Sequence, residues 1–287
     1  MQFSVAELPL ALFTTLAPLG AGAFVALACA FFTTKFSPEQ LKKIDRMTFI
    51  PLAIVIVGFI CAFFHLATPL NAPAVFMGAG SPMSNEIIAG CVFTVVVIVY
   101  VIVANAGKLS DGARKGFAAV VAVLAVVFAV FTGLAYVMST IASWNTPLVP
   151  VQMLGFALAG GAATGSLVLA LSGAWTDACK GSFKTAVTVL AVAGAVLAIV
   201  GLAGQLVTTL DMRNALVSGS DLVDAALPFA VVGLLAVSFS SDFVYSATKK
   251  GSATTRIAVA FALAVVGIFL CRVAFYALQL SVGIYLG

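Results

Sequence analysis

The sequence has few charged residues. Asp, Glu, Lys and Arg make up 8% of its 287 residues, whereas an ordinary soluble domain carries roughly 25%. With 14 basic and 10 acidic side chains, the protein cannot cover the surface of a soluble fold of this size. This shortage excludes a soluble enzyme, a disordered chain and a protein that binds nucleic acid. A polytopic membrane protein in a lipid bilayer remains.

Metal-ligating side chains are also scarce. The sequence has one histidine, His65, and its five cysteines include no C-x-x-C pair. A haem held by two histidines, an iron–sulfur cluster and a zinc site all need more ligands, closer together. We therefore expect no metal site, haem or iron–sulfur cluster in this protein, and we expect any such chemistry to come from a partner.

Long apolar runs are what the sequence has in abundance. Eight of them are long enough to cross a bilayer, which takes about 20 residues each, and they lie at 9–33, 46–66, 84–105, 114–139, 148–172, 183–209, 226–247 and 255–281. The connections are too short for a soluble domain. We predict an all-α fold, with residues 1–287 forming a single integral membrane domain of eight transmembrane helices.

The basic residues predict how the helices are oriented. Twelve of the 14 Lys and Arg residues fall in or beside the first, third, fifth and seventh connections. Because cytoplasmic loops carry an excess of Lys and Arg, these connections are predicted to be cytoplasmic. Both termini and the longer loops 67–83 and 210–225 are then extracytoplasmic.

Two segments suggest an internal repeat. The sequence LGAGAFVALA at 19–28 resembles GAATGSLVLA at 161–170, and HLATPL at 65–70 resembles QLVTTL at 205–210. The two offsets are each about half the chain. Four helices per half would make the halves parallel.

His65 and Glu86 are the first candidates for chemistry. His65 ends the second predicted span and Glu86 begins the third, both on the outward side. Consecutive antiparallel helices are usually neighbours. An imidazole with a pKa near 6.5 can accept a proton from a quinol, and a buried carboxyl can pass it on. Alternatively, His65 anchors a helix at the interface, and Glu86 only complements a helix dipole behind an N-cap at Ser84.

Arg272 is the third candidate, because an Arg inside a membrane span costs several kcal/mol unless it is paired. It lies about two-thirds along the last span. Its candidate partners are Glu86, a carbonyl group and an oxygen of a bound ligand, and we favour a structural ion pair.

Aromatic residues near the outer ends of spans are interpreted as an interfacial belt, and these are Tyr136, Trp144 and Tyr285.

Three short motifs carry a resemblance to a known family. They are HLATPL at 65–70, SNEI at 84–87, and RVAFY at 272–276 followed by Val282-Gly283. In this order, and with eight spans, the sequence resembles the membrane-anchor subunit of bacterial dimethyl sulfoxide reductase over essentially its whole length. It departs from the family pattern at Ala67-Thr68, where Gly-Ser is usual, and at Gln279, where His is common.

The resemblance implies a function in anaerobic respiration, in a bacterial cytoplasmic membrane. The protein would anchor a molybdopterin catalytic subunit and a four-cluster ferredoxin-like iron–sulfur subunit, both on the outer face. It would oxidise menaquinol and pass the electrons to the iron–sulfur subunit. The resemblance assigns quinol binding and proton transfer to His65 and Glu86, and extends quinol binding to Arg272 more weakly.

Two other functions stay open at this stage. The protein could anchor a related molybdoenzyme with another terminal acceptor, because the acceptor is bound by a different subunit. It could instead be a proton-coupled transporter of a small solute. Such transporters commonly have Gly- or Pro-interrupted spans at the midplane, and only the Gly-rich parts of the first and fifth spans fit that pattern.

Overall fold

The computed structural model describes residues 7–65, 80–249 and 253–282, and the side chain of His65 is outside this description. The part of the protein that it covers is helical, with two isolated β-bridges. The helices are α1 (Leu8–Thr33), α2 (Pro38–Met47), α3 (Phe49–His65), α4 (Pro82–Asn105), α5 (Asp111–Leu134), η3 (Ala142–Trp144), α6 (Leu148–Leu171), α7 (Trp175–Ala178), α8 (Phe183–Leu210), α9 (Gly219–Ala247) and α10 (Thr254–Ala277).

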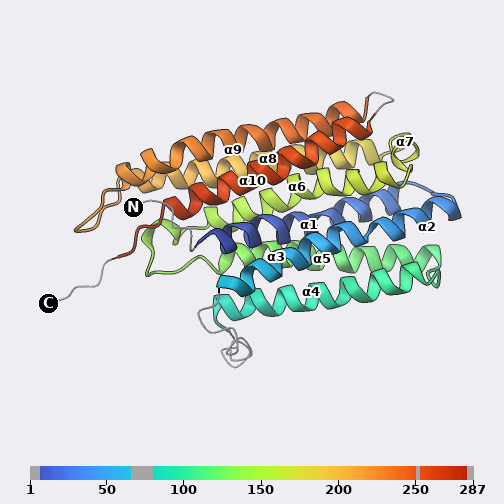
Figure 1. Cartoon of the computed structure of the whole chain (residues 1–287), viewed down its shortest axis with the longest axis horizontal. Coiled ribbons are helices and arrows are strands. Elements are labelled where there is room, and N and C mark those ends of the chain that lie inside the picture. The colour runs from blue at the N-terminus through green and yellow to red at the C-terminus, as the bar shows by residue number, and fades with distance from the viewer. Residues whose placement is uncertain (1–6, 66–79, 250–252, 283–287) are drawn as a thin grey trace.

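Within the residues that the structure describes, eight helical segments are long and apolar enough to span a membrane, which confirms the predicted number. They lie side by side along the long axis of the molecule (Figure 1). Short α2 precedes α3 with a break at Thr48, whose hydroxyl donates a hydrogen bond to the carbonyl of Asp45. Ser37 caps α2 in a reciprocal capping box with Gln40, which satisfies backbone N–H groups at the helix start.

The two ends of the bundle differ. At one end lie the last turns of α1, α4, α6 and α9 with the connections that follow, and most of the described Lys and Arg residues are there. We call this the basic end, and it is at the right in Figure 1. At the other end lie the first turns of the same helices and the last turns of α5, α8 and α10. We call this the site end.

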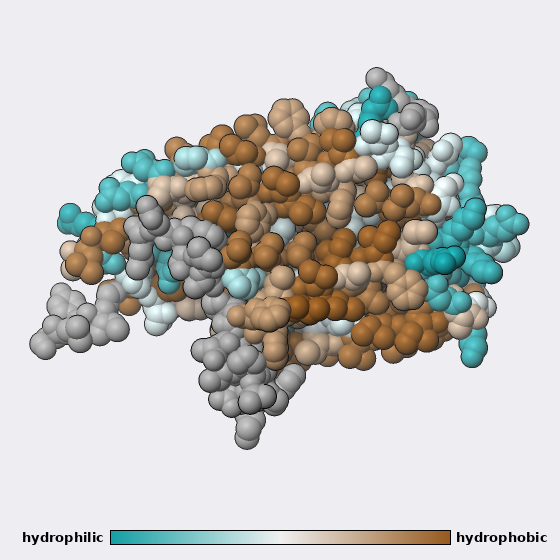
Figure 2. Space-filling model, in the orientation of Figure 1, coloured by the Kyte–Doolittle hydropathy of each residue, from teal (hydrophilic) through white to brown (hydrophobic). Residues whose placement is uncertain are grey.

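The surface between the two ends is apolar. Figure 2 shows hydrophobic residues over the middle of the visible face and hydrophilic residues gathered at both ends. Large side chains such as Val95, Ile102, Val123 and Val189 are more than half exposed there. An apolar band of this kind would aggregate in water and is what contact with lipid tails requires.

Helices α1 and α6 form the centre of the bundle, and the other helices cover them on two sides. Helix α1 packs against α3, α5 and α6, while α6 also packs against α8 and α10. The backbones of α1 and α6 touch because both helices have glycine at the crossing. A Cβ on Gly161 would lie 2.2 Å from the carbonyl carbon of Gly22, so no larger residue fits. Small residues at a crossing allow this close approach in membranes.

Helices α3 and α4 are consecutive but make only slight contact. Helix α3 packs mainly on α1, and α4 mainly on α5. Their contact is at Gly90 of α4, where an added Cβ would lie 2.7 Å from the ring of Phe59. The two helices still run in opposite directions, so the end of α3 and the start of α4 are both at the site end.

The α1–α6 crossing generates the first prediction. A Cβ on Gly22 would lie 1.8 Å from the carbonyl oxygen of Ala157, so Gly22→Ala must push α1 away from α6. Overpacking costs about 1–3 kcal/mol, and the thermal unfolding midpoint of the detergent-purified protein should fall by roughly 5 °C.

The matched control is Gly116→Ala on α5, where an added Cβ meets nothing within 4 Å. That variant should unfold at the wild-type temperature or slightly above it, because Ala favours helix over Gly by about 1 kcal/mol. Equal midpoints for the two variants would show that the crossing tolerates a methyl group.

Candidate functional site

Glu86 lies in the second turn of α4, turned into the bundle. The helix begins after Ser81, which is its N-cap, and Ser81 accepts a hydrogen bond from the backbone of Ser84. The first turn of α4 holds no acidic residue, so Ser84 is not the cap and Glu86 does not serve the helix dipole there. The Glu86 side chain is buried, and its Oε1 has no hydrogen-bond partner. Thr132 of α5 interacts with the carboxyl.

Arg272 lies in the last two turns of α10 and is fully buried. Its Nε donates a hydrogen bond of 2.8 Å to Oγ1 of Thr14 on α1, and that hydroxyl donates in turn to the carbonyl of Leu10. The two terminal nitrogens, Nη1 and Nη2, have no hydrogen-bond partner. The structure therefore fixes one edge of the guanidinium group and leaves its outer donors unused.

Aromatic rings surround the guanidinium group. Its central carbon lies 4.0 Å from the centroid of the Phe275 ring, 5.0 Å from that of Tyr276 and 5.1 Å from that of Tyr136. Trp144 of η3 stacks on Phe275 with centroids 4.8 Å apart. Such cation–π contacts stabilise a cation in surroundings that lack water. We call Tyr136, Trp144, Phe275 and Tyr276 the aromatic cage.

The hydroxyl groups of two cage residues bind each other. The oxygens of Tyr136 and Tyr276 are 2.6 Å apart, and both residues are buried. The indole N–H of Trp144 donates to the backbone carbonyl of Phe275 at 3.2 Å. The cage thus satisfies its own polar atoms and holds the loop between α5 and α6 against the end of α10.

Glu86 and Arg272 interact electrostatically but form no ion pair. The positive charge of Arg272 acts on the Glu86 carboxyl, and the charge of that carboxyl acts in turn on the hydroxyl group of Tyr136. The ion pairs among the described residues are Arg114–Asp45 and Lys180–Asp177, so the structural ion pair favoured from the sequence is absent. One buried acceptor on Glu86 and two buried donors on Arg272 therefore have no hydrogen-bond partner, and each costs about 1–3 kcal/mol or more.

His65 is the last residue of α3. The backbone of His65 is therefore at the site end, as is that of Glu86. Its side chain lies outside the described residues, so its distance from Glu86 stays a prediction. Glu86 and Arg272 are both buried at the site end, and the charge of Arg272 acts on the Glu86 carboxyl.

The belt interpretation of the aromatic residues needs correction. Tyr136 and Trp144 are 8% and 6% exposed; the ring of Tyr136 lies against Arg272 and Trp144 stacks on Phe275, while Tyr285 lies outside the described residues. The sequence does hold a signal for half of the cage. Arg272, Phe275 and Tyr276 have the i, i+3, i+4 spacing that places side chains on one face of a helix.

Other polar groups of the bundle do not form a metal site. Among residues 7–65, 80–249 and 253–282, no three His, Cys, Asp or Glu side chains are grouped so that they could hold an ion. Gln152 donates to Gln205 at 2.8 Å, and Gln205 donates to the carbonyl of Ser143 at 2.9 Å. This short network joins α6, α8 and η3 and satisfies most of its own polar atoms.

Similarities to known proteins agree with the architecture. The family described as DMSO reductase anchor subunit (DmsC) matches residues 1–278. An anaerobic dimethyl sulfoxide reductase subunit of Haemophilus influenzae is 30% identical over 52% of this sequence and 53% of its own length. The corresponding subunit of Escherichia coli K12 is 28% identical, and the subunit YnfH of the same organism 26%, each over 96% of both sequences.

The tyrosine pair generates the second prediction. Tyr136→Phe or Tyr276→Phe alone leaves one buried hydroxyl without its partner, which should lower the free energy of unfolding by about 1–3 kcal/mol. The double variant removes both hydroxyl groups. Its free energy of unfolding should be no lower than that of the less stable single variant.

A double-mutant cycle on the thermal midpoints of the purified protein measures this coupling. Strictly additive losses would mean that the two hydroxyl groups do not bind each other in the protein.

Proposed function

We propose that this protein, which belongs to the DMSO reductase anchor subunit (DmsC) family, anchors a molybdoenzyme complex in the bilayer and oxidises menaquinol there. The observation that carries the proposal is the unsatisfied polar pair at the site end. Glu86 Oε1 and Arg272 Nη1 and Nη2 are buried without hydrogen-bond partners. The hydroxyl groups of a quinol can supply the missing partners of both side chains.

The chemistry of a quinol fits the two side chains. Each of its two hydroxyl groups can donate a hydrogen bond to a carboxylate or accept one from a guanidinium group. Its flat apolar ring suits the aromatic cage around Arg272. A site of this composition, mostly apolar with a few convergent polar groups, is the usual form of a small-molecule site.

Glu86 and His65 accept protons during quinol oxidation, whereas Arg272 stabilises charge. A quinol that loses two electrons also loses two protons and becomes the quinone. Glu86 accepts a proton from the hydroxyl that it binds, and His65 accepts the second. Arg272 stabilises negative charge that develops on the oxygen as the proton leaves, in surroundings where water does not screen it. Thr14 orients the guanidinium group through Nε.

The electrons leave through partner subunits. The relatives are subunits of dimethyl sulfoxide reductases, and we propose that this protein assembles with a four-cluster iron–sulfur subunit and a molybdopterin catalytic subunit. Electrons would pass from the quinol to the nearest cluster of the iron–sulfur subunit. Both subunits would dock at the site end, on the loops at 67–83, 140–147 and 210–225, the first of which lies mostly outside the described residues.

The basic end is proposed to face the bacterial cytoplasm, because Lys and Arg are retained there. The site end, the released protons and the partner subunits then share the outer side. Electrons that move from the quinol to the partner cross little of the membrane potential, which is worth about 2.3 kcal/mol per charge per 100 mV. The complex would therefore conserve little energy itself.

Two parallel halves are part of the proposal. Tyr136 and Tyr276 are 140 residues apart, the offset of the HLATPL and QLVTTL segments, and their hydroxyl groups bind each other. In a parallel repeat, equivalent residues close to the axis meet in this way. This contact supports halves formed by α1–α5 and α6–α10, with Glu86 in the first half and Arg272 in the second.

The third prediction tests the site in the intact complex. Glu86→Gln keeps the size of the side chain and removes its ability to accept a proton, so menaquinol-driven reduction of dimethyl sulfoxide should fall by about 100-fold or more. His65→Ala should have a comparable effect. Reduction with a soluble artificial donor that bypasses the membrane subunit should stay at the wild-type rate.

Glu39→Gln is the matched control, since Glu39 is exposed at the basic end. It should leave both activities unchanged. Wild-type quinol oxidation by both site variants would disprove the site. Loss of the artificial-donor activity as well would show failed assembly, and the proton role would then have no support.

A further inference from the structure

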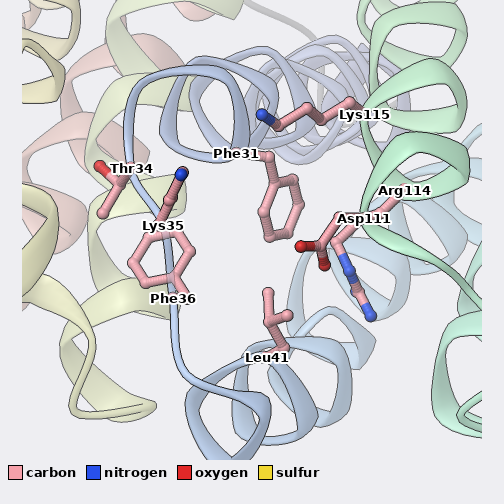
Figure 3. Close-up of a pocket in the computed structure, with 8 residues that line it drawn as sticks. All are labelled: Phe31, Thr34, Lys35, Phe36, Leu41, Asp111, Arg114 and Lys115. Carbon is pink, nitrogen blue, oxygen red and sulfur yellow. The ribbon is translucent and has the colours of Figure 1, made fainter.

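A second polar site lies at the basic end, far from Glu86 and Arg272. It is a pocket of about 210 Å³ between the end of α1, the segment that leads into α2, and the start of α5. Figure 3 shows its lining, which combines charged and aromatic side chains: Phe31, Thr34, Lys35, Phe36, Leu41, Asp111, Arg114 and Lys115.

Positive charge prevails at this pocket. Lys35 and Lys115 reach it from two different elements, the connection after α1 and helix α5 (Figure 3). Neither lysine takes part in an ion pair among the described residues. Arg114 is paired with Asp45, which is not part of the lining, and Asp111 is the acidic residue in the lining. Two lysines against one aspartate leave the pocket with a net positive charge.

Unused hydrogen-bond donors point to a missing ligand. Arg114 is 6% exposed, yet its Nε has no hydrogen-bond partner. The buried hydroxyl of Thr34 also has none. A guanidinium donor, a hydroxyl and two ammonium groups around one cavity are the set that a phosphate oxygen cluster satisfies.

The apolar part of the lining shows where this phosphate belongs. The ring of Phe36 packs edge-on against that of Phe31 at 6.2 Å, and the guanidinium group of Arg114 lies over Phe31 at 5.7 Å. These rings lie where α1 ends, at the border between the apolar band and the polar end of the bundle. That border is the depth of lipid head groups, and basic pockets between helices at this depth bind anionic lipids.

We propose that this pocket binds the phosphate of one anionic phospholipid, with Lys35, Lys115 and Arg114 as its ligands. The glycerol and the first acyl carbons lie along Phe31, Phe36 and Leu41. The bound lipid joins the connection after α1 to the start of α5, beside the buried pair of Asp45 and Arg114 that links α2 to α5. The site is independent of the proposed quinol oxidation.

Lipid binding is measured on the full-length protein, purified in neutral detergent and stripped of lipid. The probes are phosphatidylglycerol, phosphatidylcholine and inorganic phosphate. Native mass spectrometry counts bound lipid, and the thermal midpoint reports stabilisation. The wild-type protein should retain one phosphatidylglycerol with about 10-fold preference over phosphatidylcholine, and its midpoint should rise only with the anionic lipid.

Two matched double variants make this fourth prediction specific. Lys35→Gln with Lys115→Gln should lose the preference and the rise in midpoint. Lys184→Gln with Lys249→Gln removes the same charge from exposed positions at the same end and should behave as the wild type. Equal lipid binding by both double variants would overturn the proposal. So would a rise in midpoint with millimolar inorganic phosphate as large as the rise with lipid, because the ligand would then be a free anion.

Discussion

The buried guanidinium group of Arg272 is the interaction on which the site end depends. A cation cannot be placed in an apolar bundle without compensation, and three elements supply it here. Helix α1 contributes the hydroxyl of Thr14, α10 contributes the rings of Phe275 and Tyr276, and the α5–α6 connection contributes Tyr136, with Trp144 stacked on Phe275. Because these elements come from the beginning, the middle and the end of the sequence, the charge also fixes how they meet. Its two terminal nitrogens have no hydrogen-bond partner, and Glu86 lies within its electrostatic reach.

The close crossing of α1 and α6 is what brings these elements together. Glycine at both sides of the contact lets the two backbones touch, so α5 and α10 can each pack on the same central pair. With larger residues at the crossing, Thr14 on α1 would be displaced from Arg272 on α10. The small residues of α1 and α6 therefore act through packing alone. The polar groups of the proposed site, Glu86 and Arg272, lie near the ends of other helices.

The sequence predicts the spans, and it marks the buried charged residues as well, because a charge inside an apolar run is conspicuous and costly. Glu86 and Arg272 stand out for that reason. The aromatic cage does not, since Tyr136 and Trp144 at the end of a span match the interfacial belt equally well. Their burial follows from a contact with residues about 140 positions away, which no local pattern contains. Thr14 escapes prediction too, because a hydroxyl in a helix usually bonds its own backbone.

The central claim is that a quinol head group lies between Glu86 and Arg272. Photolabelling of the intact complex with a photoreactive menaquinone analogue, followed by peptide mass spectrometry, tests it most directly. The label should fall on the end of α10 around Phe275 and on the α5–α6 connection around Tyr136, and excess unlabelled menaquinol should remove it. Label confined to the helix ends at the basic end, or label that menaquinol does not displace, would contradict the account.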